Sequence, residues 1–206
     1  DKPDDPAGLY LATGDEAAAR AAINDLMKEL RRWTDEVLDG DNYTEGIHDI
    51  GYTRPMRLLT LVFDAVAGSR VMTAAERHWC LRTFAFHGYC LADANRWPDV
   101  SQGFHRGNIN FNSDDYTCRA AVIALLAGHP KQREWMDYVA AEMEKELAAS
   151  VFPGGAWIEA PNYQGYTMHY LMIAWRLMQL NGFRDFSKEP TFRATIDYLV
   201  RMQTPR

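Results

Sequence analysis

The chain has 206 residues, of which 47% are hydrophobic, and a formal net charge of −6 at pH 7. This length is enough for a domain with a sizeable core. No apolar run approaches the roughly 18 residues that a membrane-spanning helix needs, and the negative charge argues against general binding to nucleic acids or anionic membranes. An acidic substrate stays compatible with this balance, because a local cationic groove can exist on an acidic protein.

The hydrophobic pattern predicts an all-α fold. Residues 1–13 are rich in proline and aspartate, and we expect them to form an irregular lead-in. Beyond them, apolar residues recur at every third or fourth position between glycine and proline breaks. This spacing predicts seven helices, at about 15–38, 55–68, 73–94, 113–127, 131–149, 161–182 and 190–202. Thr73 and Glu76 form a capping-box signature at the start of the third.

The order of the polar segments bears on how these helices are arranged. With no alternating strand pattern, we expect one helical domain over residues 1–206, built of antiparallel hairpins. Periodicity alone does not choose between a bundle, a solenoid and an (α/α) toroid. The loops at 40–53, 95–112 and 153–162 precede alternate helices, so in a ring of hairpins they emerge at one end. That order favours an (α/α) toroid or part of one.

The stretch 153–182 is the strongest candidate for a functional site. A glycine turn leads to Glu159, and a helix then opens near Pro161, where a proline has no N–H bond to lose. The first turns of this helix carry Tyr163, Tyr166, His169 and Tyr170. Tyr166 and Tyr170 also begin an apolar stripe, so a core role is the alternative, and it is favoured for Tyr170. A lone helix histidine is more often packed than catalytic, and Glu159 is placed to cap the helix.

The loop at 104–112 is the second candidate. It carries one histidine, one arginine and three asparagines, which are His105, Arg106, Asn108, Asn110 and Asn112. Arginine binds carboxylates through two parallel hydrogen bonds, and an asparagine amide can donate to a carboxylate as negative charge builds up on it. For Asn112 the alternative is a helix N-cap role, since a helix is expected to follow directly.

Other chemistries find less support. The six histidines are scattered, no HExxH motif is present, and the three cysteines form no CxxC pair, so we expect neither a metal nor another cofactor. A glycosidase with two carboxylates remains open, because Asp114 or Asp115 together with Glu159 could supply an acid and a base. Aspartates at a helix start are more usually solvated caps.

Three stretches together resemble the heparinase II/III-like polysaccharide lyases: RGNINFNSDDYTCRAAVIALLAGHP, GGAWIEAPNYQGYTMHYL and YLVRMQTPR. The second is the most specific, with a glycine turn, an aromatic residue, an acid and then P-x-Y-x-x-Y at a helix start. The likeness covers roughly residues 100–206. It implies a toroid followed by a downstream β-sandwich domain, and a secreted or periplasmic bacterial enzyme. The start at Asp1 and the abrupt end after Gln203 fit a segment of such a longer protein.

The resemblance also implies a reaction, the cleavage of an acidic, uronic-acid-containing polysaccharide by β-elimination without a cofactor. Asn108 or Asn112 would neutralise the uronate carboxylate, and Tyr163 or Tyr166 would serve as the acid and base. Supporting contacts to the substrate would come from His105, Arg106, Asn110, Glu159 and His169. The alternatives are a glycoside hydrolase using Asp115 and Glu159, and a non-catalytic carbohydrate-binding segment.

Overall fold

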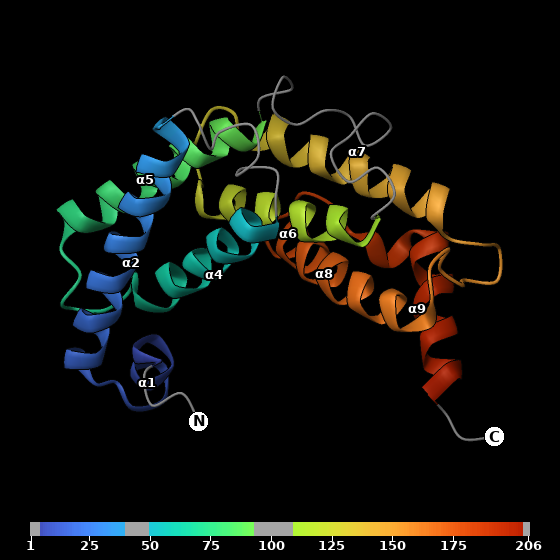
Figure 1. The fold of residues 1–206 in the computed structure, drawn as a ribbon, viewed down its shortest axis with the longest axis horizontal. Helices are drawn as coiled ribbons and strands as arrows, with labels where there is room; N and C mark the ends of the chain where they lie inside the picture. The colour runs from blue at the N-terminus through green and yellow to red at the C-terminus, as the bar shows by residue number, and fades with distance from the viewer. Residues whose placement is uncertain (1–4, 40–49, 93–108, 204–206) are drawn as a thin grey trace. The chain divides into compact units, whose positions relative to one another are not determined.

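The computed structural model describes residues 5–39, 50–92 and 109–203, and it confirms the all-α prediction (Figure 1). Over these ranges the chain forms helices joined by turns, and the extended backbone is limited to one isolated bridge between Val151 and Trp157. The toroid stays a prediction. Most of the loop predicted at 40–53, and the loop predicted at 95–112 up to residue 108, lie outside the described residues.

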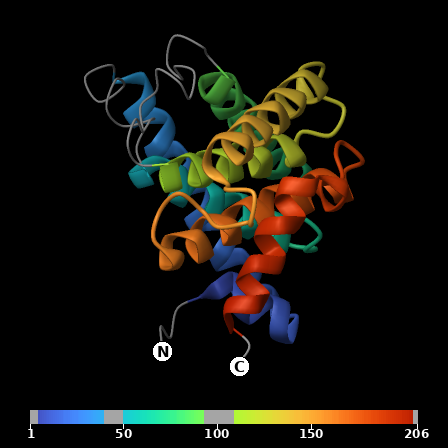
Figure 2. The ribbon, with the colours of Figure 1, turned by 90° about the vertical axis from the view of Figure 1, so that its right-hand side faces the viewer.

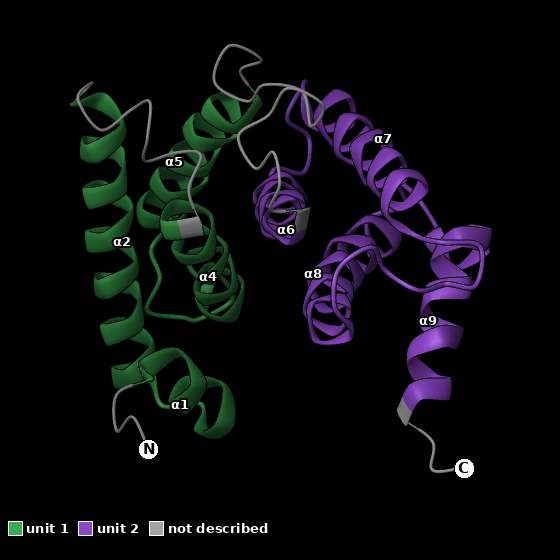
Figure 3. Cartoon of the chain, turned by 45° about the vertical axis from the view of Figure 1, so that its right-hand side comes forward, with its two compact units in different colours: residues 1–96 green, residues 97–206 purple. Residues whose placement is uncertain are grey.

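The chain divides into two compact units, residues 1–96 and 97–206 (Figure 3). Unit 1 contains α1 (Pro6–Thr13), α2 (Glu16–Leu38), α4 (Ile50–Val66) and α5 (Ala74–Ala92). Unit 2 contains α6 (Ile109–Leu125), α7 (Gln132–Ser150), α8 (Pro161–Leu180), the short 3-10 helix η1 (Phe186–Lys188) and α9 (Pro190–Gln203).

The predicted lead-in at residues 1–13 is wrong for its second half, which forms helix α1. Asp5 is the N-cap, and its carboxylate accepts a hydrogen bond from the Gly8 N–H at 3.0 Å. Pro6 occupies the first helical position, where a missing N–H costs nothing. Gly14, in a left-handed conformation with φ of 72°, ends the helix. Proline and aspartate thus serve here as helix-start residues.

The second predicted helix begins earlier than expected. Helix α4 starts at Ile50, so Pro55 lies inside its second turn. A proline at this position forfeits one backbone bond near the helix end, and the packing of α4 against α1 and α2 outweighs that loss. The buried side of α4 includes Phe63 and Val66, whereas Leu58 is exposed.

The capping box of α5 is confirmed. The Thr73 hydroxyl accepts from the Glu76 N–H at 3.2 Å, and the Glu76 carboxylate accepts from the Thr73 N–H at 2.8 Å. Arg20 of α2 also donates to this carboxylate, at 2.6 Å. The start of α5 is therefore held both locally and by a neighbouring helix.

Helix α6 is the central helix of unit 2. Every residue from 113 to 123 is buried, and the helix packs against α7 and α8. It begins at Ile109, four residues before the predicted start, so Asn112 lies within its first turn. The alternative that Asn112 is an N-cap is therefore wrong. Asparagine, serine and aspartate have weak helix propensity, and the packing of this segment overrides it.

The buried face of α8 is displaced from the predicted stripe. Tyr170 is buried as expected, but Leu180, which continues the same apolar spacing at the end of the helix, is 65% exposed. The residues of α8 that the core covers are Gln164, Thr167, Met168, Tyr170, Leu171, Ala174 and Met178. Helix α8 has apolar residues on most sides, so spacing alone could not select the face. None of the helices in the described ranges is both long and apolar enough to cross a membrane.

Candidate functional site

Hydrogen bonds fix the directions of the three main helices of unit 2. Asp114 of α6 pairs with Tyr166 of α8, and one turn later Thr117 donates to the Tyr170 carbonyl at 2.7 Å, so α6 and α8 run parallel. Asn112 pairs with Glu146 of α7, and Gln132 at the other end of α7 donates to the carbonyl of Ile123 at 3.0 Å. Helix α7 is thus antiparallel to α6, as Figure 1 shows.

One end of unit 2 therefore gathers the N-termini of α6 and α8 and the C-terminus of α7. Side chains in an α-helix lean toward its N-terminus, so residues in the first turns of α6 and α8 lean toward this shared end. Helix N-termini also carry partial positive charge. We call this the catalytic end, after the predicted catalytic residues Asn112, Tyr163 and Tyr166 that it contains. It comprises the first turns of α6 and α8, the last turns of α7 and residues 151–160.

On the α8 side of α6, a phenol is bonded to a carboxylate. The Tyr166 hydroxyl donates to Asp114 Oδ2 at 3.0 Å, and its ring lies 4.7 Å from that of Tyr170. Burial, a hydrogen bond with Tyr170 and the Asp114 charge all raise the pKa of Tyr166 well above its ordinary value. Tyr166 therefore holds its proton at neutral pH. The sequence offered Asp114 only as an acid, a base or a solvated cap.

Asn110 lies on the same face of α6 as Asp114, one turn closer to the helix start. Helices α6 and α8 run in the same direction, and two hydrogen bonds, Asp114–Tyr166 and Thr117–Tyr170, set their register. One turn closer to the helix starts, Asn110 therefore lies level with the first turn of α8. Its side chain is 5% exposed, and its Oδ1 atom has no hydrogen-bond partner among the described residues. Leaving such a buried acceptor unsatisfied costs about 1–3 kcal/mol. Asn110 thus brings to the catalytic end a buried amide oxygen that makes no hydrogen bond within the described part of the chain.

On the α7 side of α6, the Asn112 amide donates from Nδ2 to Glu146 Oε2 at 3.1 Å. Ser150 makes a longer contact of 3.5 Å to the same carboxylate. Burial raises the pKa of Glu146 to about 7, and the charges of Glu159 and Glu142 act in the same direction. Glu146 is not among the residues predicted from the sequence. Its position could have indicated a buried carboxylate, because it lies on the apolar stripe of α7 beside Met143 and Leu147, both of which are buried.

Asp115 is engaged elsewhere. It is buried and pairs with Arg119 of its own helix at 3.2 Å. Burial raises its pKa to about 6, against the opposing effect of Arg119. A carboxylate held in this way within α6 is poorly placed to act with Glu159 as the glycosidase pair that the sequence left open.

The segment 151–160 is a tight hairpin that Gln164 clamps. Gln164 accepts from the Trp157 N–H at 3.1 Å and donates to the Gly155 carbonyl at 2.8 Å. Gly155 has φ of 89°, and a Cβ added there would lie 2.0 Å from the Ala194 carbonyl oxygen of α9. Figure 2 shows α9 beside this segment. The glycine turn of the sequence is therefore required by close contact as well as by conformation.

Glu159 takes its place from this hairpin. Its Oε2 accepts from the Trp157 indole N–H at 2.9 Å, while Ala160 occupies the N-cap position of α8. The alternative that Glu159 caps α8 is not what the structure shows. The indole holds the carboxylate close enough to Glu146 for its charge to raise the pKa of that residue.

The remaining candidates divide into exposed and undescribed residues. Tyr163 is 46% exposed in the first turn of α8. His169 is also exposed, touches the edge of the Tyr170 ring and opens onto a shallow hollow that continues along α8 to Arg176. His105, Arg106 and Asn108 lie outside the described residues.

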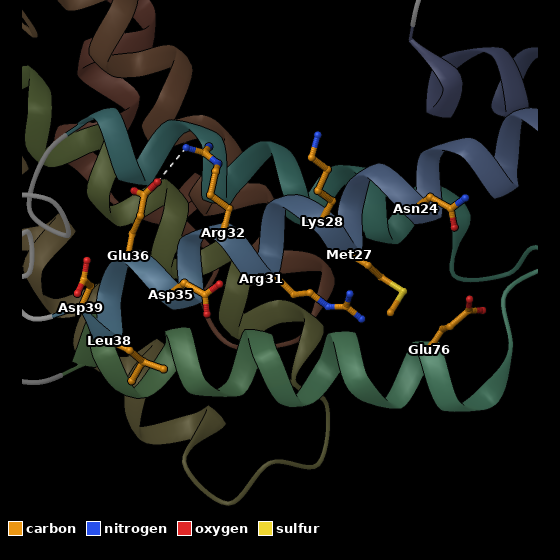
Figure 4. A pocket seen from close by; sticks show the side chains of 10 residues that line it. All are labelled: Asn24, Met27, Lys28, Arg31, Arg32, Asp35, Glu36, Leu38, Asp39 and Glu76. Atoms are coloured by element: carbon orange, nitrogen blue, oxygen red, sulfur yellow. Dashed lines mark hydrogen bonds and ion pairs between the residues drawn. The ribbon is translucent and has the colours of Figure 1, made fainter.

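A larger hollow of different character lies in unit 1, between α2 and α5 (Figure 4). Its lining mixes cations and carboxylates, and includes none of the predicted site residues: Asn24, Met27, Lys28, Arg31, Arg32, Asp35, Glu36, Leu38, Asp39 and Glu76. Arg32, for instance, pairs with Glu36 at 3.0 Å. With three basic and four acidic side chains, this surface favours neither charge strongly.

Across the described residues, no three histidine, cysteine or acidic side chains are grouped so as to hold a metal ion. Comparisons with protein-family models, curated proteins and solved structures found no match to this chain. The case for function therefore rests on the catalytic end itself.

Proposed function

We propose that this protein is a polysaccharide lyase that cleaves a uronic-acid-containing polysaccharide by β-elimination. The observation that carries the proposal is the Tyr166–Asp114 hydrogen bond of 3.0 Å at the end of unit 2 where Asn110, Asn112 and Tyr163 also lie. The resemblance to heparinase II/III-like lyases adds support, because Asp114 and Tyr166 lie in two of the three stretches that carry it. We extend the proposal to the toroid, a downstream β-sandwich and a secreted or periplasmic bacterial location.

The catalytic end is suited to binding a carboxylate. The N-termini of α6 and α8 contribute partial positive charge, and an anion there is favoured by roughly 0.3–1 kcal/mol per helix end. Asn112 brings a side-chain amide to this end, and the buried Asn110 amide adds polar capacity. In the proposed reaction, Asn112 donates to the uronate carboxylate, which acidifies the C5 proton of the sugar.

The Tyr166–Asp114 pair can move the protons of an elimination. As the phenolic oxygen takes the C5 proton, the phenolic hydrogen passes to Asp114. The C5 electron pair then forms the C4–C5 double bond, and the C4–O bond breaks. The phenol delivers a proton to the departing glycosidic oxygen and recovers one from Asp114. A phenol with a raised pKa suits this exchange, because it does not rest as a phenolate.

The test is the ultraviolet absorbance of the unsaturated uronate product on a panel of polymers: heparan sulfate, chondroitin, hyaluronan, alginate, glucuronan and ulvan. Tyr166→Phe and Asp114→Asn are each expected to lower kcat by about 10²–10⁴-fold, the usual contribution of a proton-transfer group. A comparable loss of kcat in Tyr163→Phe would show that this exposed phenol also takes part in the proton transfer. Tyr10→Phe, a change in α1 of unit 1, is the matched control.

Other results would redirect the assignment. New reducing ends without the chromophore would replace the lyase with a glycoside hydrolase. Binding of a polymer without cleavage, unchanged by Tyr166→Phe, would leave a carbohydrate-binding segment.

A further inference from the structure

Asn112 of α6 and Glu146 of α7 are 34 residues apart in the chain, and the fold brings their side chains into hydrogen-bond contact. Glu146 is 3% exposed, whereas Asn112, in the first turn of α6, is half-buried, so part of its side chain stays accessible at the catalytic end. The orientation of this amide decides whether the catalytic end is offered a donor or an acceptor.

The groups around Glu146 come from each of the neighbouring segments. Helix α7 contributes Ser150 and Glu142, the hairpin contributes Glu159, and α6 contributes Asn112 and Tyr116. Within the described ranges, no lysine, arginine or histidine forms an ion pair with Glu146. A buried carboxylate beside two other acids, with no paired cation, binds a proton readily.

The two protonation states of Glu146 make different demands on the amide. An ionised carboxylate only accepts, so it holds the Asn112 NH₂ group toward itself, as the structure has it at 3.1 Å. A protonated carboxyl group donates its O–H, and its best partner is the amide oxygen of Asn112. The amide then turns by half a rotation, and its NH₂ group faces the catalytic end.

We propose that Glu146 is the positioning residue of Asn112, and that its proton decides which edge of the Asn112 amide faces the catalytic end. The consequence for activity rests on the proposed function, because the outward NH₂ group is the one that donates to a uronate carboxylate. With the outward oxygen, the same position repels that carboxylate. The device thus couples substrate binding to pH near neutrality, since burial raises the pKa of Glu146 to about 7.

The turning of the amide can be followed without a substrate. In nuclear magnetic resonance spectra, the Asn112 side-chain NH₂ signals are expected to titrate with a midpoint near 7, the pKa of Glu146. In Glu146→Gln they are expected not to titrate over the same range, because an amide partner does not change protonation. Asn112 signals that stay constant in the wild-type protein would overturn the proposal, even if the variant failed to fold.

The activity profile supplies the second readout. Wild-type kcat/KM is expected to fall about tenfold per pH unit above the transition, following the protonated fraction. Glu146→Gln should remove this fall of kcat/KM at high pH. Glu142→Gln, which removes a neighbouring negative charge, should move the fall to lower pH. If Glu146 had only a structural role, its substitution would lower stability and leave the pH dependence of kcat/KM unchanged. If the amide signals titrate and no polymer is cleaved, the proposed function fails while the positioning role stands.

Discussion

At the residue scale, Gly155 has the most constrained environment in the hairpin. Its φ of 89° is unfavourable for other residues, and an added Cβ would lie 2.0 Å from a backbone oxygen of α9. Gly155→Ala is therefore expected to cost on the order of 1–3 kcal/mol from the backbone conformation, and more from displacement of α9. Urea unfolding monitored by circular dichroism measures the loss.

Gly154→Ala is the matched control, because nothing lies within 4 Å of a Cβ built at that glycine. It is expected to leave stability unchanged or to raise it by about 0.4–1 kcal/mol. Equal effects of the two substitutions would contradict the role assigned to the close contact with α9.

His87 is a second residue whose behaviour follows from its surroundings. It is fully buried, its Nδ1 lies 2.7 Å from the Tyr52 hydroxyl, and its Nε2 lies 3.3 Å from the Thr34 hydroxyl. The Thr34 hydroxyl donates to the Leu30 carbonyl, so its oxygen accepts from His87 Nε2–H. Burial lowers the pKa of His87 to about 4.

This lowered pKa predicts a loss of stability in acid. In the unfolded chain His87 binds a proton near pH 6.5, whereas in the folded chain it binds one only near pH 4. The free energy of unfolding therefore falls as pH decreases from about 6.5 to about 4. The full effect is roughly 3 kcal/mol. Unfolding free energies of the wild type and His87→Gln, measured from pH 7 to 4, isolate the histidine's share. A native His87 imidazole that titrates near 6.5 would refute the prediction.

At the element scale, the entry into α8 depends on one side chain. Gln164 lies in the first turn of α8 and bonds both to the Trp157 N–H and to the Gly155 carbonyl. Truncation would leave two buried backbone groups of the hairpin without partners, each worth about 1–3 kcal/mol. The clamp thereby holds Glu159 and the start of α8 in one arrangement.

Gln164→Ala is accordingly expected to destabilise the protein by roughly 2–4 kcal/mol and to speed hydrogen exchange at the Trp157 amide. Gln179→Ala is the control on the same helix, since Gln179 bonds to the side chains of Arg176 and Asp185 near the surface. Protection at Trp157 that survives Gln164→Ala would show that the hairpin holds without the clamp.

At the scale of the whole molecule, the two units are expected to respond to pH in opposite directions. In unit 1, the lowered pKa of His87 makes stability fall as pH decreases. In unit 2, burial raises the pKa of Glu146 to about 7 and that of Asp115 to about 6. A carboxyl group with a raised pKa in the folded state stabilises it at low pH, and this stability is lost as pH rises through about 4 to 7.

Hydrogen exchange resolved along the chain is therefore expected to show unit 1 losing protection relative to unit 2 as pH falls from 7 to 4, after correction for intrinsic exchange rates. Glu146→Gln should weaken the pH dependence of unit 2 and leave that of unit 1 unchanged. A parallel response of both units in the wild type would contradict this assignment of the buried groups.

Local signals in the sequence were sufficient for the helices that follow α1. The 3.6-residue spacing of apolar side chains, the Thr73–Glu76 capping box and the break near Gly128 depend on neighbours a few residues apart, and the structure confirms them. The candidate segments around Tyr166 and Asn112 were chosen on the same local grounds, because polar and aromatic side chains gather there in place of an apolar pattern.

Only the tertiary structure decided which of these side chains meet. The Tyr166–Asp114 bond spans 52 residues, and the Asn112–Glu146 bond spans 34, so neither partner is marked by local spacing. The early start of α6 has the same origin, since packing against α7 and α8 overrides weak helix propensity. The pKa of Glu146 was equally out of reach, because desolvation depends on every element that packs around the carboxylate.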